Sequence, residues 1–206
     1  MPEYSSPSDQ PQPEAAQDDT LIARCIRGDQ QSYADLYQRY ADSVYRLCNT
    51  LLYTQEDAED VVQESFVYAF RNIGRYDSQK ASFKTWLFTI AISRCRNMYR
   101  RKQFLTVDLS AALQLRLAAP NGERPEAALA RRDAREAVEV AVKGLPSQLR
   151  EALVLRYAHG LTYREIAEIM DCPQKTAESR VRLAHKKLRK TMQGHGPALL
   201  EEILQI

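Results

Sequence analysis

Apolar residues recur three and four positions apart along most of the chain, and no stretch alternates strictly between apolar and polar residues. The first pattern predicts amphipathic helices, whereas half-buried strands would need the second. The 206 residues include only 7 glycines, and 44% of them are hydrophobic, which suits a helical protein with its own core. We therefore expect an all-α fold of two small helical domains joined by a flexible linker, the second containing a helix-turn-helix.

The first domain is predicted over residues 19–102 and begins with two helices. A short helix over residues 21–27 ends at Gly28, and a long helix follows over residues 31–52. Aromatic side chains are frequent on the long helix, but their three-and-four spacing favours core packing over base stacking. This apolar stripe consists of Tyr33, Leu36, Tyr37, Tyr40, Val44, Leu47, Cys48 and Leu51.

An acidic helix and a basic helix complete the first domain. The acidic helix spans residues 56–73, Gly74 occupies the position of a left-handed cap, and residues 75–81 form a polar connection. The basic helix begins near Phe83 and ends in five cations, more than the helix dipole needs. The inward stripes consist of Ala58, Val62, Phe66, Ala69, Phe70 and Ile73 in the acidic helix, and of Phe83, Trp86, Leu87, Ile90, Ala91, Cys95 and Met98 in the basic helix. The polar face of the acidic helix carries Asp57, Asp60, Gln63 and Glu64.

The two ends of the chain lie outside these domains. Residues 1–18 are rich in proline and nearly free of apolar side chains, so we expect a disordered tail. Its acids either are simply solvated or compete with DNA for basic surfaces. Residues 194–206 form an amphipathic extension that docks a regulator or another copy, or packs back on its own domain. The acids up to Thr20 are Glu3, Asp9, Glu14, Asp18 and Asp19.

Helical periodicity fades over residues 103–125, which we interpret as a linker. The second domain follows over residues 126–193. Its first helix ends at Gly144, and a second opens at Pro146 and stops at Gly160. The inward residues expected in these two helices are Ala130, Ala134, Ala137, Val138 and Ala141, and then Leu149, Leu153, Val154 and Tyr157.

The end of the second domain has the pattern of a helix-turn-helix. Thr162 and Glu165 form a capping box at the start of a short helix that ends around Met170. A tight turn over residues 171–173 leads into a longer helix over residues 174–191, which carries seven basic residues against one acid. A basic helix in this position predicts DNA contact rather than a merely solvated face. Its inner face consists of Ala177, Val181, Ala184 and Leu188, and its outer face of Lys175, Ser179, Arg182, Leu183, Lys186 and Lys190.

Charge and reactive side chains narrow the function classes. The formal net charge of +2 does not indicate nucleic acid by itself, but two helices end in basic clusters. The histidines lie at no ligand spacing from each other or from a cysteine, and we find neither a Gly-rich phosphate loop nor a nucleophile with a base. We therefore predict no catalytic residue, no metal site and no cofactor. The cysteines have no paired spacing and are expected as small buried hydrophobic residues: Cys25, Cys48, Cys95 and Cys172.

The sequence shows no membrane or export signal. No stretch is long and apolar enough to span a bilayer, and the N-terminus lacks the basic start and apolar run of a signal peptide. We expect a cytoplasmic protein that does not insert into a membrane.

Two segments carry a family resemblance. DAEDVVQESFVYAF and FKTWLFTIAISRCRNMYRRK resemble domain two of bacterial RNA polymerase sigma factors of the sigma-70 family, particularly the extracytoplasmic-function (ECF) subfamily. LPSQLREALVLRYAHGLTYREIAEIMDCP, followed by SRVRLAHKKLR, resembles domain four of the same family. In that family, domain two binds core polymerase and melts promoter DNA, domain four reads the upstream element, and the linker threads the polymerase. The linker of this chain fits either that path or a plain tether.

The resemblance implies three groups of contact residues. The contacts to core RNA polymerase are Asp60, Gln63 and Glu64. The contacts to the downstream promoter element, including its melting, are Tyr76, Asp77, Ser78, Ser93, Arg94, Asn97, Arg100 and Arg101. The contacts to the upstream element are Lys175, Thr176, Ser179, Arg180, Arg182, Leu183, Lys186 and Lys187.

The expected role is a transcription initiation factor that brings core polymerase to promoter DNA, without catalytic chemistry of its own. The resemblance also implies an anti-sigma factor, a partner that the family often uses. The chain departs from the family at Lys175, which is commonly Gly, at Glu178, commonly basic, and at Leu183, commonly Arg. The alternatives are a free-standing helix-turn-helix regulator, which would not need the acidic helix, and an enzyme on a helical scaffold.

Overall fold

The computed structural model of the protein describes residues 13–52, 54–105, 138 and 140–191. Its regular elements within these ranges are all helical, which confirms the all-α fold. They are α1 (Pro13–Ile26), α2 (Gln30–Leu51), α3 (Gln55–Arg71), the 3-10 helix η1 (Ile73–Arg75), α4 (Phe83–Leu105), α6 (Ser147–Tyr157), α7 (Tyr163–Met170) and α8 (Gln174–Thr191). The predictions for residues 1–12, 106–137 and 192–206, which cover most of the tail, the linker and the C-terminal extension, lie outside the described residues.

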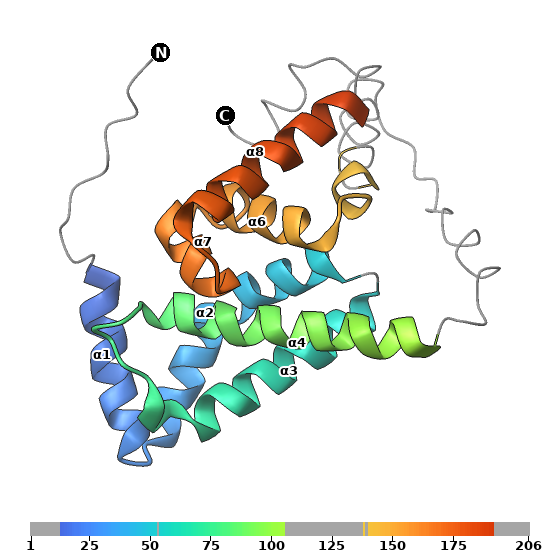
Figure 1. The fold of residues 1–206 in the computed structure, drawn as a ribbon. Helices are drawn as coiled ribbons and strands as arrows, with labels where there is room; N and C mark the ends of the chain where they lie inside the picture. Colours follow the sequence, from blue (N-terminus) through green and yellow to red (C-terminus); the bar gives the residue numbers. More distant parts are fainter. Residues whose placement is uncertain (1–12, 53, 106–137, 139, 192–206) are drawn as a thin grey trace, which may run out of the picture.

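The helices form two groups that lie against each other (Figure 1). In the first group α1 packs along α2, and α2, α3 and α4 pack on one another. In the second group α8 packs on both α6 and α7. The groups meet where α4 contacts α7 and where α2 contacts α6, so α4 is shared between the core of its own group and the junction.

Helix α1 begins earlier than the sequence predicted. We expected a tail up to residue 18 and a helix from residue 21, but α1 already begins at Pro13. Asp18, which we counted among the solvated acids, is 5% exposed. Its carboxylate accepts a hydrogen bond from Arg39 at 2.6 Å and another from the hydroxyl of Tyr40. Both partners belong to α2, more than twenty residues away, so the local composition gave no sign of them.

The end of α3 also differs from the prediction. The helix stops at Arg71, and a turn of 3-10 helix follows that contains Gly74. Gly74 is not among the described residues with positive φ, so the left-handed cap predicted there is wrong. The cap is instead Asn72, whose side-chain amide and backbone N–H both donate to the carbonyl of Tyr68. A side chain that satisfies a terminal carbonyl removes the need for a left-handed residue.

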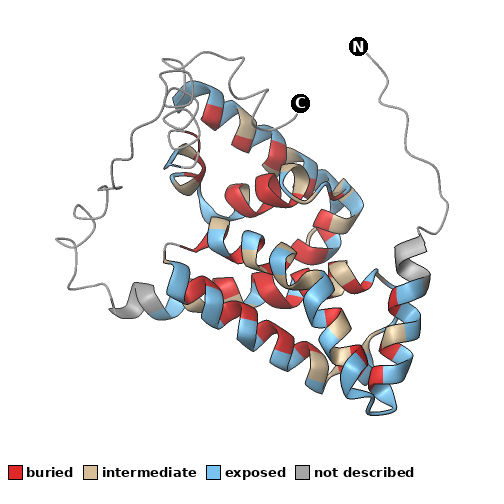
Figure 2. Ribbon diagram, turned by 180° about the vertical axis from the view of Figure 1, so that it is seen from behind, coloured by how far each residue is buried: buried red, intermediate tan, exposed pale blue. Residues whose placement is uncertain are grey.

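Helix α4 is buried on two faces, of which the sequence analysis recognised one. The predicted stripe lies in the core of the first group, with Phe83 1% and Leu87 0% exposed. Phe88 and Ile92 are also fully buried, although they lie outside that stripe. The ring of Phe88 meets the ring of His159, which follows α6, at 4.8 Å between centroids. The second face therefore packs against the second group, and buried residues line the junction in Figure 2.

The helix-turn-helix forms as predicted. The side chain of Thr162 accepts from the Glu165 N–H, and the Glu165 carboxylate accepts from the Thr162 N–H, which completes the capping box. Asp171 ends α7 in the left-handed region at φ 50° and turns the chain into α8. All four predicted inner residues of α8 are buried, namely Ala177, Val181, Ala184 and Leu188.

Candidate protein and nucleic-acid interfaces

The outer face of α3 is acidic near its start and apolar near its end. The three residues predicted to bind polymerase, Asp60, Gln63 and Glu64, are all exposed on it. The face continues into Val67, which is 49% exposed, and Tyr68, which is 44% exposed. The sequence analysis did not single out these two residues, although both lie outside the apolar stripe that it predicted for this helix. Asp57, expected on the same polar face, is instead 8% exposed.

Arg94 joins two residue groups that the sequence analysis kept apart. It lies on α4 and was predicted to contact DNA, yet its Nη1 donates to Oε2 of Glu64 on α3 at 2.9 Å. Its guanidinium also lies 5.0 Å from the centre of the Tyr68 ring. Planar guanidinium groups bind carboxylates and stack on aromatic rings, and Arg94 does both at once. The proposed polymerase and DNA contact groups therefore meet at this side chain.

The loop after η1 contains Tyr76, Asp77 and Ser78, three of the residues predicted to contact the downstream element and to take part in its melting. Tyr76 is half-buried, with its ring against Phe83 and Trp86 at centroid distances of 5.6 and 5.5 Å. Its hydroxyl donates to the carbonyl of Ala81 at 3.1 Å, across the loop. Burial, with a smaller contribution from the carboxylates of α1 and Asp77, raises the pKa of Tyr76 to about 12. Tyr76 thus remains a neutral donor that ties the loop to the core.

Asp77 and Ser78 are exposed at the tip of this loop. The Asp77 carboxylate accepts from the backbone N–H of Gln79 at 3.0 Å and pairs with Lys80 at 3.2 Å. The Gln79 hydrogen bond, followed by Lys80, lowers the pKa of Asp77. The loop thus presents an ionised carboxylate and a hydroxyl, which could accept hydrogen bonds from a base edge.

The outer side of α4 carries the other residues predicted for the downstream element. Ser93, Asn97, Arg100 and Arg101 are exposed there, and Arg100 donates to the side chain of Asn97. Exposed guanidinium groups beside hydroxyl and amide groups can bind phosphates and base edges together. Arg96, in the same basic run, instead turns towards the second helical group.

The outer face of α8 presents most of the residues predicted for the upstream element. Lys175, Arg182, Lys186 and Lys187 are exposed, and Leu183 among them is 48% exposed. Thr176, Ser179 and Arg180 are only partly exposed. Nη2 of Arg180 donates to Gln148 of α6 at 3.0 Å, so this side chain is held against its own domain. The exposed residues form a basic strip with one apolar side chain in it, on the helix that a helix-turn-helix inserts into the major groove.

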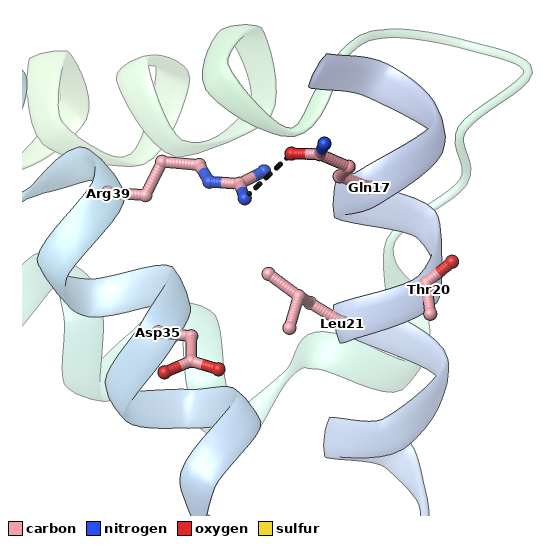
Figure 3. A pocket seen from close by; sticks show the side chains of 5 residues that line it. All are labelled: Gln17, Thr20, Leu21, Asp35 and Arg39. Atoms are coloured by element: carbon pink, nitrogen blue, oxygen red, sulfur yellow. Dashed lines mark hydrogen bonds between the residues drawn. The ribbon is translucent and has the colours of Figure 1, made fainter. Parts of the chain in front are cut away.

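A pocket lies apart from these candidate interfaces. An open pocket between α1 and α2 is lined by Gln17, Thr20, Leu21, Asp35 and Arg39 (Figure 3), and Arg39 reaches across it to Gln17. Both charge signs occur there, and the Arg39 guanidinium is already held by Asp18 and Gln17. Among the residues that the structure describes, no three His, Cys, Asp or Glu side chains gather as a metal site.

The cysteines are free, and Cys25, Cys48 and Cys95 are buried as predicted, whereas Cys172 is only partly buried and the prediction for it is wrong. Cys48 and Cys95 meet in the core of the first group with 3.9 Å between sulfurs, a proximity that their spacing in the sequence could not indicate. The hydrogen bond to Cys48, together with burial, raises the pKa of Cys95 well above the usual value. Both therefore behave as small core residues, as predicted. No helix within the described ranges is long and apolar enough to cross a membrane.

Comparisons with known proteins agree with this arrangement. Sigma-70 region 2 matches residues 22–104, and Sigma-70, region 4 matches residues 135–188. The RNA polymerase sigma-H factor of Pseudomonas aeruginosa is 33% identical over 183 residues, which cover 86% of this chain and 94% of that protein. The ECF RNA polymerase sigma factor SigW of Bacillus subtilis is 30% identical over 83% of this chain and 94% of its own length. The ECF sigma-E factor of Escherichia coli is 34% identical over 85% of this chain and 94% of its own length.

Two solved structures share the fold. CnrH, solved in complex with the cytosolic domain of CnrY, matches 87% of this chain and 99% of its own with a TM-score of 0.64 and 24% identity. The sigma factor RpoE from Bartonella quintana, solved with the anti-sigma factor NepR, matches 79% of this chain and 99% of its own with a TM-score of 0.62 and 22% identity. The matched regions coincide with the two helical groups, and the relatives are matched over nearly their whole length. The chain therefore belongs to the sigma-70 family of RNA polymerase sigma factors, as a member of its ECF subfamily.

Proposed function

We propose that this protein is a transcription initiation factor that binds core RNA polymerase and directs it to specific promoters. The observation that carries the proposal is the presence, in one ECF-type chain, of an exposed acidic face on α3 and an exposed basic face on α8. A free-standing regulator would use the second face without the first. The family consists of initiation factors rather than enzymes, and we assign no catalytic step to this chain.

The two helical groups divide the work. Asp60, Gln63 and Glu64 contact core polymerase from the outer face of α3. The loop at Asp77, together with the outer side of α4, binds the downstream element after a base has left the stack. Helix α8 enters the major groove of the upstream element, where Leu183 faces the bases. The work of the protein is thus selective binding, which lowers the cost of opening DNA at chosen sites.

We further propose that an anti-sigma factor holds the protein inactive until a signal arrives. The support is by analogy, since the structurally similar RpoE was solved with the anti-sigma factor NepR. Polymerase and promoter DNA are cytoplasmic in bacteria, so the same proposal places the protein in the cytoplasm.

Reconstitution tests this function directly. The purified chain is mixed with core polymerase, and co-elution in gel filtration is followed by transcription of a genomic fragment library. We expect a stable holoenzyme and discrete new start sites that core polymerase alone does not use. DNA binding without co-elution would favour the free-standing regulator and overturn the proposal.

A further inference from the structure

Glu64 and Arg94 belong to different partners in the proposed function, yet they bind each other in the free chain. The proposed polymerase contact of Glu64 needs its carboxylate, and the proposed phosphate contact of Arg94 needs its guanidinium. The 2.9 Å ion pair occupies both groups at once. Tyr68 covers the guanidinium from one side at 5.0 Å.

We propose that Glu64 and Tyr68 restrain Arg94 in the free protein, and that core polymerase releases Arg94 for DNA when it binds Glu64. The proposal rests on the proposed function and adds to it a coupling between its two binding partners. Tyr68 acts as a positioning residue here, because it holds Arg94 without being assigned to DNA itself.

The geometry of Arg94 suits a restraint that can be released. Its side chain keeps 26% of its exposure, and that of Glu64 keeps 48%, so the pair lies at the surface and can exchange partners. The Nε of Arg94 is buried and donates to no acceptor. A guanidinium with an unused donor gains a further hydrogen bond when it turns to a phosphate, which accepts two parallel bonds.

The polymerase face is placed to disturb this restraint. Glu64, Val67 and Tyr68 lie on one exposed side of α3, so a partner bound to that side touches both groups that hold Arg94. A basic group from the partner competes with Arg94 for the Glu64 carboxylate. A surface packed on Tyr68 shifts the ring on which Arg94 stacks.

Coupling between two binding partners is reciprocal, so the variants should show gains in affinity that the loss of a merely stabilising residue would not produce. Removing Arg94 frees the Glu64 carboxylate, so Arg94→Gln should bind core polymerase more tightly than the parent chain. Neutralising Glu64 frees Arg94, so Glu64→Gln should bind DNA more tightly in the absence of polymerase. A residue that only stabilised the fold would weaken both kinds of binding when replaced.

The test uses the full chain and a labelled random-sequence single-stranded 20-mer, with binding followed by fluorescence anisotropy. We expect Glu64→Gln to raise DNA affinity without polymerase roughly fivefold, within the usual range of coupling. Asp60→Asn is the matched control, because it removes one negative charge from the same face without touching the Arg94 pair. The double variant Glu64→Gln with Arg94→Gln should lose the gain, and Arg94→Gln alone should bind core polymerase more tightly by the same factor, roughly fivefold.

Three outcomes overturn the inference: equal gains for Asp60→Asn and Glu64→Gln, a gain that survives in the double variant, or a lower core affinity for Arg94→Gln. Circular dichroism of each variant is measured alongside and should match that of the parent chain. Failure of the proposed function looks different, since the parent chain would then not bind core polymerase at all. In that case the DNA affinities of the parent, Glu64→Gln and Asp60→Asn still test whether Glu64 restrains Arg94.

Discussion

Nη2 of Arg96 on α4 lies 2.7 Å from Oε2 of Glu151 on α6, and this ion pair joins the two helical groups. The Glu151 side chain is only 3% exposed, while that of Arg96 is 36% exposed. The hydrogen bond to Glu151 raises the pKa of Arg96. Next to it, Arg150 donates to the hydroxyl of Tyr99, so two arginine contacts cross the junction in opposite directions. A buried carboxylate is costly without a cationic partner, so the closed junction requires an arginine opposite Glu151.

Arg96→Glu should therefore separate the two helical groups. Breaking a buried pair costs about 3–5 kcal/mol, and we expect roughly 1–3 kcal/mol here, because Arg96 is a third exposed. Fluorescence energy transfer between labels on α3 and α8 should fall and the radius of gyration should rise. Arg71→Glu, an equally basic but exposed position on α3, is the control and should change neither. Combining Arg96→Glu with Glu151→Arg should restore part of the transfer; no recovery would mean that the pair does not hold the groups together.

The junction should also weaken in acid because of His159. Burial, followed by the nearby charges of Lys84 and Arg46, lowers the pKa of His159 to about 4. In the unfolded or separated state His159 binds a proton near pH 6.5, whereas in the closed state it stays neutral until about pH 4. The free energy that holds the junction closed is therefore at its maximum above pH 6.5 and falls as the pH drops from 6.5 to 4. The total loss should approach about 3 kcal/mol, since one pKa unit corresponds to about 1.4 kcal/mol.

The difference between the parent and His159→Phe isolates this effect from the titration of carboxylates in the same range. Chemical denaturation at pH 7 and pH 4.5 should show a smaller loss of stability for His159→Phe. Phenylalanine is a suitable replacement because its ring can keep the edge-on contact that the imidazole makes with Phe88, 4.8 Å between centroids. The imidazole Nε2 is buried without a hydrogen-bond partner, so no hydrogen bond of that atom is lost. Parallel losses in the two proteins would exclude His159 as the group responsible.

The junction between the two helical groups shows how far the spacing of apolar residues can predict this fold. Within the described residues of the second group, the predicted helices correspond to α6, α7 and α8, and three-and-four spacing identified the buried stripe of α8. The predicted helix that ends at Gly144 lies mostly outside the described residues. On α4 a second series at 88, 92, 96 and 99 repeats at four, four and three, but it includes Arg96 and Tyr99 and so resembles a solvent face. Their contacts with residues of the second group explain why they are covered: Phe88 meets His159, Arg96 pairs with Glu151, and Tyr99 accepts from Arg150. Contacts between distant elements leave no local pattern.

The candidate interfaces also contain a part that the sequence could predict and a part that it could not. The faces of α8 followed from projection alone, because a helix fixes the direction of each side chain. The contact between Glu64 and Arg94 could not be predicted, since it depends on how α3 packs against α4. The same holds for Arg180, which we expected to face DNA and which Gln148 holds partly buried.

Reversing two charges on α3 should weaken polymerase binding. Asp60→Lys with Glu64→Lys should lower core affinity by roughly tenfold or more, because complementary charges at an interface are replaced by repulsion. A competition assay against another sigma factor measures the change. Both positions are exposed, so the helical content should remain that of the parent. Unchanged affinity with an intact fold would remove these residues from the polymerase interface.

Promoter opening should depend on the loop tip more than on Tyr76 itself. Asp77→Ala with Ser78→Ala leaves the packing of Tyr76 on Phe83 and Trp86 intact. If these two side chains contribute about 1 kcal/mol towards holding a flipped base, opening should fall roughly fivefold while polymerase binding stays the same. Permanganate reactivity of promoter thymines reports the opening. Tyr76→Phe, which loses only the bond to the Ala81 carbonyl, is the control for loop order. Undiminished reactivity in the double variant would place the pocket elsewhere.

Leu183 should determine one base of the upstream element. It is 48% exposed on α8, between the exposed cations Arg182 and Lys186. An exposed leucine alone means little, but in the groove it cannot donate a hydrogen bond and can pack against the methyl group of a thymine. We therefore expect a thymine opposite Leu183. Leu183→Arg should shift the preference there towards guanine by about 1–3 kcal/mol, because an arginine can donate two hydrogen bonds to the guanine edge.

The control for this shift is a residue on the flank of the same face. Lys187 is exposed there, and Lys187→Ala should weaken binding to all sequences about equally and reduce its salt dependence, as expected for a phosphate contact. Arg180 is less suitable, because Gln148 already binds its guanidinium. Selection from a randomised upstream element with the parent, Leu183→Arg and Lys187→Ala separates the two effects. Identical base preferences for the parent and Leu183→Arg would show that Leu183 does not face the bases, since a change from an apolar side chain to a forked donor cannot be silent in the major groove.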